Sequence, residues 1–600
     1  MVDSPFYPFS SHSSSGPVAP SPVTPRSPST APDWVVTAAG MRAIESAMFE
    51  AGMPVAALME KAAQRMADWV MAQFPSTAYA QVGILVGPGH NGGDALVMAR
   101  KLARAGYGVQ LLSPFERHKD LTADHLRYAR ALGLPISSTW PLGEGRGDLA
   151  PTVYRPGNRG VPLRTCDQTV DLWIDGLFGF GLERPIEGAA ADLIAVVNAH
   201  PAPVVSLDVP SGLHTDTGQA LGTAIQATHT LCLGLWKRAF CQDAALPYLG
   251  QRHRIDLDIP PFALESGLEN EPPARRISAS EALNRLPLPR PGNTHKYRVG
   301  QLLIVAGSRQ YAGAAVLAGL GARASGVGML TLAVPEALRL MVVAQLPEAL
   351  VIGCPETDTG AIAQFPADLA DFHRRYDAIA CGPGLSRQAG AVVDRVLASN
   401  RPLLLDADAL NHLAARDPTL TLAQRPAPTL ITPHPGEFQR LFPNLLAQSA
   451  DPGQAAQVAA AQSHSIVVLK GACTALAHPD GQLWFNAEST SGLARGGSGD
   501  VLTGLMGGLL AQNIAAQTIA QASHGWYPSQ DRPSQASSPP PPVLDDRWNL
   551  ALDAALAGVW WHSQTARDLA TRYTTLGVDG PHLAAALTAS LSHRFTCPID

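Results

Sequence analysis

The stretch "ARGGSGDVLTG", from Ala494 to Gly504, places a carboxylate inside a glycine-rich turn that precedes an apolar run. Asp500 could simply cap the helix that this run predicts. A cap needs none of the glycines Gly496, Gly497 and Gly499, whereas glycines let backbone N–H groups approach an anion closely. A carboxylate beside such an anion site can accept a hydroxyl proton during phosphoryl transfer. We therefore predict a phosphate site with Asp500 as its base.

The length and composition are those of a protein with two globular domains. A chain of 600 residues is too long for one core, and its 46% hydrophobic and 16% charged residues are typical of globular proteins. The formal net charge is −6, without a basic stripe of the kind that binds nucleic acid. No apolar run is long enough to span a membrane. We therefore expect neither nucleic acid nor a membrane as a partner.

The cysteines and the N-terminal segment indicate a cytoplasmic protein. Seven scattered cysteines form no CxxC pair and no metal-ligand spacing, which predicts reduced thiols. The start of the chain lacks the basic-then-apolar pattern of a secretion signal. Residues 1–33 include the Ser/Pro-rich stretch "SPFYPFSSHSSSGPVAPSPVTPRSPSTAP" and are expected to form a disordered tail.

Short apolar runs alternate with helical patterns from Trp34 onward, which predicts mostly parallel sheets covered by helices. The first half contains the strand-like segments "VGILVGPG", "VQLLSP", "LWIDGLFGFG", "APVVSLDVPSG" and "HTLCLGL". The second half contains "QLLIVAGS", "MLTLAVPE", "DAIACGPG", "PLLLDADALN", "PTLITPHPGE" and "SIVVLKGACTAL". A polar, Pro-rich stretch around residues 265–276 separates the two series. We predict two three-layer α/β/α domains, residues 34–265 and 277–600.

Two segments fit neither core. Residues 143–162, "GEGRGDLAPTVYRPGNRGVP", are predicted to form a surface loop, and residues 523–546, "SHGWYPSQDRPSQASSPPPPVLDD", a flexible insertion.

Polar groups follow three strands of the first half, in "GPGHNGGDAL", "IDGLFGFGLERP" and "SLDVPSG". Ligands of open parallel sheets bind beyond the carboxyl ends of the strands. Asn91, Asp175 and Ser211 offer amide, carboxylate and hydroxyl oxygens, the hard ligands that an alkali or alkaline-earth cation prefers. The alternative is that each oxygen caps the next helix.

These segments resemble the NAD(P)H-hydrate epimerase domain over most of residues 34–265. The opening stretch "VVTAAGMRAIESAMFEAGMPVAALMEKAA" is similar to the first helix of that family, and Lys237 matches a lysine that the family carries near its site. The resemblance implies a Rossmann-like domain with Asp208 as acid/base and a potassium ion on Asn91, Asp175 and Ser211. It also implies that the hydrated nucleotide contacts His90, Asn91, Gly92, Gly93, Asp94, Gly179, Phe180, Gly181, Leu182, Glu183, Arg184, Pro185 and Asp208.

The first half departs from the family's signature at two positions. His90 stands where the family usually has an asparagine, and Ala95 stands where a glycine commonly follows the aspartate. Neither departure removes an expected ligand of the potassium ion, so we expect both to be tolerated.

The second half carries a series of motifs typical of ribokinase-like small-molecule kinases. In order they are "HK", "GS" with "YAGA", "GPGL", "HPGE", "LKG" and "GGSGD". They resemble the ADP-dependent NAD(P)H-hydrate dehydratase from about residue 277 to the end, apart from the insertion and from Ser386, which replaces a usual glycine. By this resemblance Ala314, Gly384, His434 and Asp500 contact the hydrate. Lys470, Gly471, Ala472, Cys473, Thr474 and Gly499 contact the nucleotide, which carries magnesium.

The combined resemblance implies a metabolite-repair enzyme, expected as a homo-oligomer. It would epimerise NAD(P)H hydrate, phosphorylate the hydroxyl of one epimer with ADP and eliminate phosphate, giving NAD(P)H, AMP and phosphate. The rival interpretation is a small-metabolite kinase with a non-enzymatic N-terminal binding or regulatory domain. Two smaller alternatives stay open: His434 could be a structural residue, and Asp406 and Asp408 could be catalytic, although helix capping is expected for at least one of them.

Overall fold

The computed structural model describes residues 33–138, 170–269, 274–524 and 545–596. The described chain from Asp33 onward forms one compact unit. The predicted tail (except Asp33), the predicted surface loop at 143–162 and residues 525–544 of the predicted insertion lie outside the described residues. Helix α18 (Ser498–His524) ends where that gap begins, and α19 (Asp546–Tyr573) follows it.

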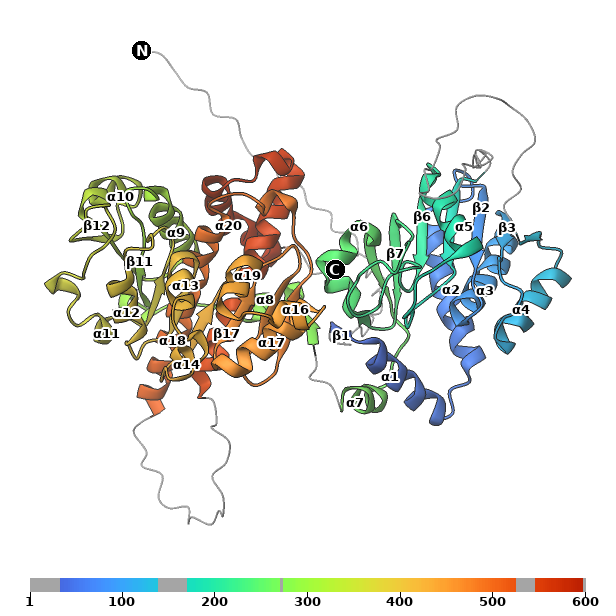
Figure 1. The fold of residues 1–600 in the computed structure, drawn as a ribbon, viewed down its shortest axis with the longest axis horizontal. Coiled ribbons are helices and arrows are strands. Elements are labelled where there is room, and N and C mark those ends of the chain that lie inside the picture. Colours follow the sequence, from blue (N-terminus) through green and yellow to red (C-terminus); the bar gives the residue numbers. More distant parts are fainter. Residues whose placement is uncertain (1–32, 139–169, 270–273, 525–544, 597–600) are drawn as a thin grey trace, which may run out of the picture. The chain divides into compact units, whose positions relative to one another are not determined.

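The first half is built on a seven-stranded sheet in which every neighbouring pair is parallel, in the order β4-β3-β2-β5-β6-β7-β9 (Figure 1). Its strands are β2 (Gln81–Val86), β3 (Gly108–Leu112), β4 (Ile136–Ser137), β5 (Leu172–Gly176), β6 (Val204–Leu207), β7 (His229–Leu233) and β9 (Gln251–Ile255). Helices α2 (Val55–Gln73), α3 (His90–Arg104) and α4 (Asp120–Ala131) pack on one face, and α5 (Gly188–Ala199) packs on the other. Burial of both faces explains the continuous apolar runs of these strands.

The second half is built on a twelve-stranded mixed sheet, in the order β13-β12-β11-β14-β15-β16-β17-β18-β19-β10-β1-β8. Its main strands are β11 (Gln301–Val305), β12 (Met329–Pro335), β13 (Leu350–Cys354), β14 (Ala378–Cys381), β15 (Leu403–Leu405), β16 (Thr429–Ile431), β17 (Ile466–Leu469), β18 (Thr474–Ala477) and β19 (Leu483–Asn486). Strands β11 to β17 pair in parallel, whereas β17, β18 and β19 form an antiparallel meander. The predicted α/β class is therefore confirmed for both halves.

Helices cover both faces of the second sheet. One face is covered by α8 (Ala279–Asn284), α9 (Ala312–Ser325), α18, α19 and α20 (Gly580–Thr596), and the other by α12 (Gly390–Leu397), α13 (Ala407–Ala414), α15 (Pro435–Leu441) and α17 (Pro452–Ser463). The predicted core position of Trp560 and Trp561 in α19 is confirmed, because both side chains are buried. The shorter helices are α6 (Leu246–Leu249), α7 (Pro261–Leu268), α10 (Arg339–Gln345), α11 (Phe372–Arg375), α14 (Pro418–Ala423) and α16 (Leu445–Gln448).

The stretch predicted only as a polar separator contains a strand that joins the two halves. Strand β10 (Ala274–Arg276) pairs with β19 on one side and with β1 (Trp34–Val36) on the other, and β1 also pairs with β8 (Trp236–Lys237). The guanidinium group of Arg275 lies over the rings of Trp34 and Trp484. Two of the three residues of β10 are arginines, so its sequence lacks the hydrophobic signal of a strand.

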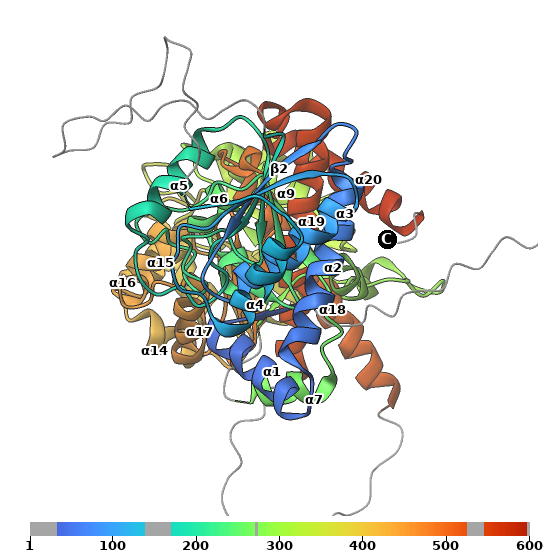
Figure 2. The same ribbon diagram turned by 90° about the vertical axis from the view of Figure 1, so that its right-hand side faces the viewer.

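The opening segment that resembles a single helix is divided in two. Helix α1 (Ala38–Glu50) ends before Gly52, whose φ of +101° lies in the left-handed region, and Pro54 is the N-cap of α2. Helix α1 packs against α7, as the two views agree (Figures 1 and 2). Three residues of α1, Arg42, Glu45 and Phe49, line the cavity described below.

The described cysteines are buried, as expected for core thiols. The five described cysteines, Cys232, Cys241, Cys354, Cys381 and Cys473, are free and buried, while Cys166 and Cys597 lie outside the described residues. Among the described helices, none combines the length and the apolar character needed to cross a membrane.

Candidate active sites

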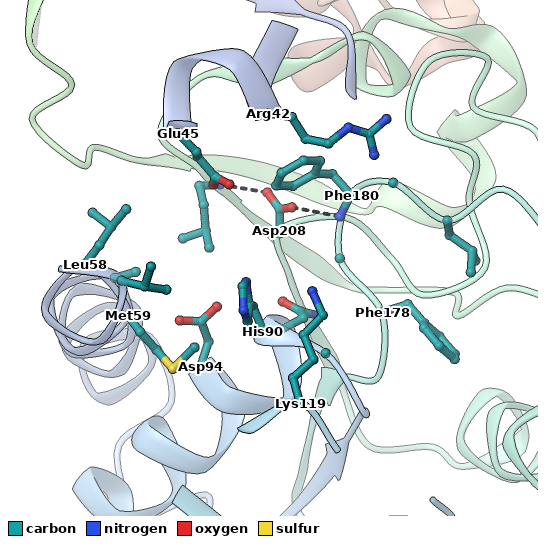
Figure 3. A pocket seen from close by; sticks show the side chains of 18 of the residues that line it. Arg42, Glu45, Leu58, Met59, His90, Asp94, Lys119, Phe178, Phe180 and Asp208 are labelled. Carbon is teal, nitrogen blue, oxygen red and sulfur yellow. Dashed lines mark hydrogen bonds between the residues drawn. The ribbon is translucent and has the colours of Figure 1, made fainter. Parts of the chain in front are cut away.

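A cavity of about 490 Å³ opens at the carboxyl ends of β2, β5 and β6 in the first half (Figure 3). Of the residues predicted to bind the hydrate, its lining brings together His90, Asn91, Asp94, Gly179, Phe180, Gly181, Leu182 and Asp208. Five others, Gly92, Gly93, Glu183, Arg184 and Pro185, are not part of the lining. A Cβ on Gly92 would lie 2.0 Å from the carbonyl oxygen of Gly87, so this glycine allows α3 to start against the end of β2.

The side chain of Asp208 faces this cavity (Figure 3). Its φ of +67° lies in the left-handed region that non-glycine residues rarely adopt. Its Oδ2 accepts a hydrogen bond from the N–H of Phe180 at 3.1 Å, and its Oδ1 lies 2.6 Å from Nζ of Lys237. Burial by itself lowers the pKa of Lys237, but the charge of Asp208 holds that pKa above its usual value. The two side chains therefore form a buried ion pair.

Two further carboxyl groups of the cavity can carry protons. Burial raises the pKa of Glu45 to about 7, although Lys237 partly opposes the shift. Burial also raises the pKa of Asp94 well above its usual range, and the charges of Asp208 and Glu45 add to the rise. Glu45 was not predicted from the sequence. The available signal was a charged residue four positions after Met41, on the buried face of α1.

The three predicted potassium ligands lie at neighbouring strand ends and are buried. The hydroxyl of Ser211 donates to Oδ1 of Asp175 at 2.6 Å, and its N–H donates to Oδ2 at 2.9 Å. A Cβ on Gly179 would lie 3.3 Å from Cγ of Asn91, and within the described chain neither side-chain amide atom of Asn91 has a hydrogen-bond partner. An unpartnered buried amide beside a carboxylate and a hydroxyl fits a hard cation.

The helix-capping alternative for these oxygens is wrong. Helix α3 begins after Gly89 without a side-chain cap, and Asp175 and Ser211 bond to each other rather than to a helix start. Among the described residues, no group of three or more His, Cys, Asp and Glu side chains could hold a metal ion. A cation here would therefore rely on the mixed amide, carboxylate and hydroxyl set.

In the second half, the glycine turn of "GGSGD" meets the lysine of "LKG". Gly497 has a φ of +94°, and α18 begins at the next residue, so Asp500 lies in its first turn. A Cβ on Gly499 would lie 3.7 Å from Nζ of Lys470. Burial raises the pKa of Asp500 to about 7, and the charge of Asp406 adds to the rise. The site thus combines Lys470, the start of α18 and Asp500, an acid with a pKa of about 7.

Asp406 holds the side chain of Lys470 in this site. Its Oδ1 lies 2.7 Å from Nζ of Lys470, and its Oδ2 accepts a hydrogen bond from the hydroxyl of Thr503 at 2.7 Å. Burial by itself raises the pKa of Asp406, but Lys470 holds that pKa below its usual value. Asp406 is therefore a buried carboxylate that fixes the direction of the lysine.

The prediction that Asp406 or Asp408 caps a helix is wrong. Asp406 occupies the N-cap position of α13 without a side-chain cap bond. Asp408 accepts a hydrogen bond from the N–H of Ser386 at 2.8 Å. Asp406 instead pairs with the charged Lys470, and Asp408 accepts from a loop N–H outside its own helix.

Two of the remaining predicted hydrate contacts lie together. Gly384 has a φ of +62°, and a Cβ on it would lie 2.8 Å from Cβ of Ala314. His434 caps α15: its Nδ1 accepts a hydrogen bond from the N–H of Gly436 at 3.0 Å, and Glu437 completes the capping box. The structural role left open for His434 is thus present, and about half of its side chain is exposed.

His562 is a residue that the sequence did not single out. Its Nε2 lies 2.9 Å from the carbonyl oxygen of Ser498, and burial lowers its pKa to about 4. A neutral imidazole therefore ties α19 to the first turn of α18. The signal was the polar run His562 to Thr565, which directly follows the apolar stretch from Ala554 to Trp561 in the same helix.

The fold and these sites define a two-part α/β enzyme with an acid–base cavity in one half and a lysine–glycine-turn site in the other. The sequence model described as "YjeF-related protein N-terminus" matches residues 55–239, and the one described as "NAD(P)H-hydrate dehydratase" matches residues 302–538. The chain belongs to the family of bifunctional NAD(P)H-hydrate repair enzymes.

Membership rests on similarity to curated relatives over nearly their whole length. The bifunctional NAD(P)H-hydrate repair enzyme Nnr of Thermosynechococcus vestitus is 46% identical over 558 residues, which cover 93% of this chain and 97% of that protein. The enzyme of the same name from Gloeobacter violaceus is 46% identical, with coverage of 93% and 98%. Among solved structures, the ADP/ATP-dependent NAD(P)H-hydrate dehydratase of Bacillus subtilis is 30% identical, covers 53% of this chain and 98% of its own, and has a TM-score of 0.40.

The loop that departs from the family at Ser386 provides a stability test. Ser386 has a φ of +66°, a conformation that costs a non-glycine residue about 1 kcal/mol or more. We expect Ser386→Gly to raise the free energy of unfolding by roughly 1 kcal/mol, measured by urea denaturation. Asn444→Gly, at another left-handed position with a φ of +75°, is the matched control and should gain less, because asparagine tolerates this region. A loss of stability in Ser386→Gly would contradict the expectation.

Proposed function

We propose that the chain repairs hydrated NAD(P)H in two steps. The epimerase domain, residues 34–265, interconverts the R and S hydrates. The dehydratase domain, residues 277–600, converts the S hydrate and ADP into NAD(P)H, AMP and phosphate. The observation that carries the proposal is Asp500, an acid with a pKa of about 7 beside Lys470 and a glycine turn. Because the dehydratase takes one epimer, an epimerase on the same chain makes the whole pool usable.

The carboxyl groups of the cavity support acid–base chemistry in the epimerase domain. Epimerisation requires the ring hydroxyl to leave one face and an oxygen to return on the other. Asp94, whose pKa burial raises well above its usual range, would give a proton to the departing hydroxyl, so that water leaves. The carboxylate of Asp208 would then take a proton from the water that adds to the other face. Lys237, whose Nζ lies 2.6 Å from Oδ1 of Asp208, would orient that side chain for the step.

The potassium site is part of the same proposal. Asn91, Asp175 and Ser211 would hold the ion, and the unpartnered amide of Asn91 supports this assignment. A bound cation would supply positive charge beside the phosphates of the hydrated nucleotide.

The dehydratase chemistry follows from Asp500 and its neighbours. Asp500 would accept the proton of the ring hydroxyl, whose oxygen attacks the terminal phosphoryl group of ADP and releases AMP. Phosphate then leaves together with a ring proton, which restores the double bond, because phosphate is a better leaving group than hydroxide. Lys470 and the N–H groups of the glycine turn would stabilise the charge on the phosphoryl group. Magnesium would arrive with ADP, since the described chain holds no acidic cage for it.

The central experiment separates repair from kinase activity. Incubating the protein with mixed NADHX epimers, ADP and magnesium should restore the absorbance of NADH and release AMP and phosphate. Asp500→Asn should lower this rate by at least about a thousandfold, because the base is lost, while epimerisation persists. A stable phosphorylated product without NADH would instead identify a small-metabolite kinase.

The pH dependence of dehydration reports the ionisation of Asp500. A base works when deprotonated, so kcat/KM should rise with pH through about 7, the pKa of Asp500. Asp406→Asn should move this acidic limb to lower pH, because it removes a negative charge that raises the pKa of Asp500. Thr503→Val, which removes only the hydrogen bond to Asp406, is the matched control and should leave the limb in place. An unshifted limb in Asp406→Asn would contradict this assignment.

The epimerase assignment has a separate test. Asp208→Asn should reduce the exchange of R and S hydrates by at least about a hundredfold, followed by chromatography without ADP. Dehydration of pure S hydrate should persist in this variant, which also shows that the chain is folded. Asn91→Leu should remove any dependence of the epimerase rate on potassium. Epimerisation at the wild-type rate in Asp208→Asn would favour a non-enzymatic N-terminal half.

A further inference from the structure

The loop proposed to bind the adenine nucleotide is held by a side chain from the other half of the chain. The loop is the turn between β17 and β18. The N–H of Cys473 donates to Oδ1 of Asp243 at 2.7 Å, and the N–H of Ala472 donates to Oδ2 at 3.1 Å. Asp243 opens the short turn η2 (Asp243–Ala245), which follows β8 and belongs to the epimerase half. Each oxygen of the carboxylate takes one N–H, and such charge-assisted bonds are stronger than neutral ones.

The loop has the sequence that this contact requires. A Cβ on Gly471 would lie 2.9 Å from Oδ2 of Asp243, so a larger residue would displace the carboxylate. On the other side of the loop, Lys470 points its ammonium group to Asp406. The loop is therefore fixed at its lysine side chain by the dehydratase half and at its backbone by the epimerase half.

The segment that carries Asp243 is itself anchored. The guanidinium Nε of Arg238 lies 2.6 Å from Oδ2 of Asp451, and the amide of Gln242 donates to Oδ1 of Asp451 at 2.9 Å. Asp451 is the N-cap of α17 in the dehydratase half. Arg238 and Asp451 are both mostly buried, so the contact belongs to the packed interior of the compact unit. The segment that carries Asp243 is thus fixed to the dehydratase half by Arg238 and Gln242.

We propose that Asp243 is a positioning residue for the nucleotide loop of the dehydratase. The inference rests on the proposed function, because it takes Lys470 to Thr474 as the loop that binds ADP. The N–H groups of Ala472 and Cys473 already donate hydrogen bonds to Asp243. The phosphates of ADP would therefore be bound by Lys470 and by the glycine turn before Asp500. The carboxylate of Asp243 sets the shape of the loop in advance, which spares ADP the cost of ordering it.

The test compares ADP kinetics in full-length variants with saturating S hydrate and magnesium. Asp243→Ala should raise KM for ADP roughly tenfold, because two hydrogen bonds that order the loop are lost, and should leave kcat within about twofold. Asp243→Asn keeps one acceptor oxygen and should raise KM about threefold. The epimerase rate without ADP should not change in either variant, because Asp243 does not line the cavity.

Two further variants separate the possible outcomes. Gln242→Ala removes a bond at the same interface without touching the loop and should leave KM for ADP unchanged. An equal rise of KM for ADP in Gln242→Ala and Asp243→Ala would overturn the inference, because the cause would be a loosened interface.

Lys470→Ala tests the loop itself: unchanged ADP binding in this variant would refute the proposed nucleotide site. If Lys470→Ala weakens ADP binding but both Asp243 variants keep the wild-type KM for ADP, the positioning role of Asp243 is refuted and the proposed nucleotide site stands. If Asp243→Ala does not fold, the Asp243→Asn result decides.

Discussion

Parallel strands deliver the residues that follow them to one edge of a sheet, and both candidate sites depend on this constraint. In the first half it gathers Asn91, Asp175 and Asp208, which are far apart in sequence, at the ends of β2, β5 and β6. In the second half it brings Asp406, after β15, and Lys470, after β17, within 2.7 Å of each other. Most of the candidate residues lie in the loops and helix starts that follow the strands, and Asp175 lies at the end of β5 itself.

In each half, two aspartates lie in different electrostatic environments. Each contains one buried aspartate in contact with a lysine, Asp208 with Lys237 and Asp406 with Lys470. Each also contains an acid without such a partner, whose pKa rises because burial disfavours its charge, as with Asp94 and Asp500. An ionised and a protonatable acid side by side allow proton transfer near neutral pH. The environment, and not the residue type, separates their roles.

The two halves are more closely joined than two domains on a linker. Strand β10 continues the large sheet, and β1 and β8 from the first half extend it further. The segment that starts at β8 carries Lys237 toward the epimerase cavity and, six residues later, Asp243 toward the loop after β17. A short rigid segment therefore contacts both sites. This contact gives a structural reason, beyond shared substrate, for keeping both halves on one chain.

The sequence by itself determined the α/β class, the two series of strands and the turns that carry most of the polar groups. It did so because buried parallel strands have continuous apolar runs and because glycines mark close backbone approaches. It did not reveal Glu45, His562, Asp243 or the pairing of Asp406 with Lys470, and it gave β10 no strand signal. Those features depend on contacts between residues distant in the chain. Only the tertiary structure decides which buried acid meets a lysine, and that meeting sets whether the acid is charged.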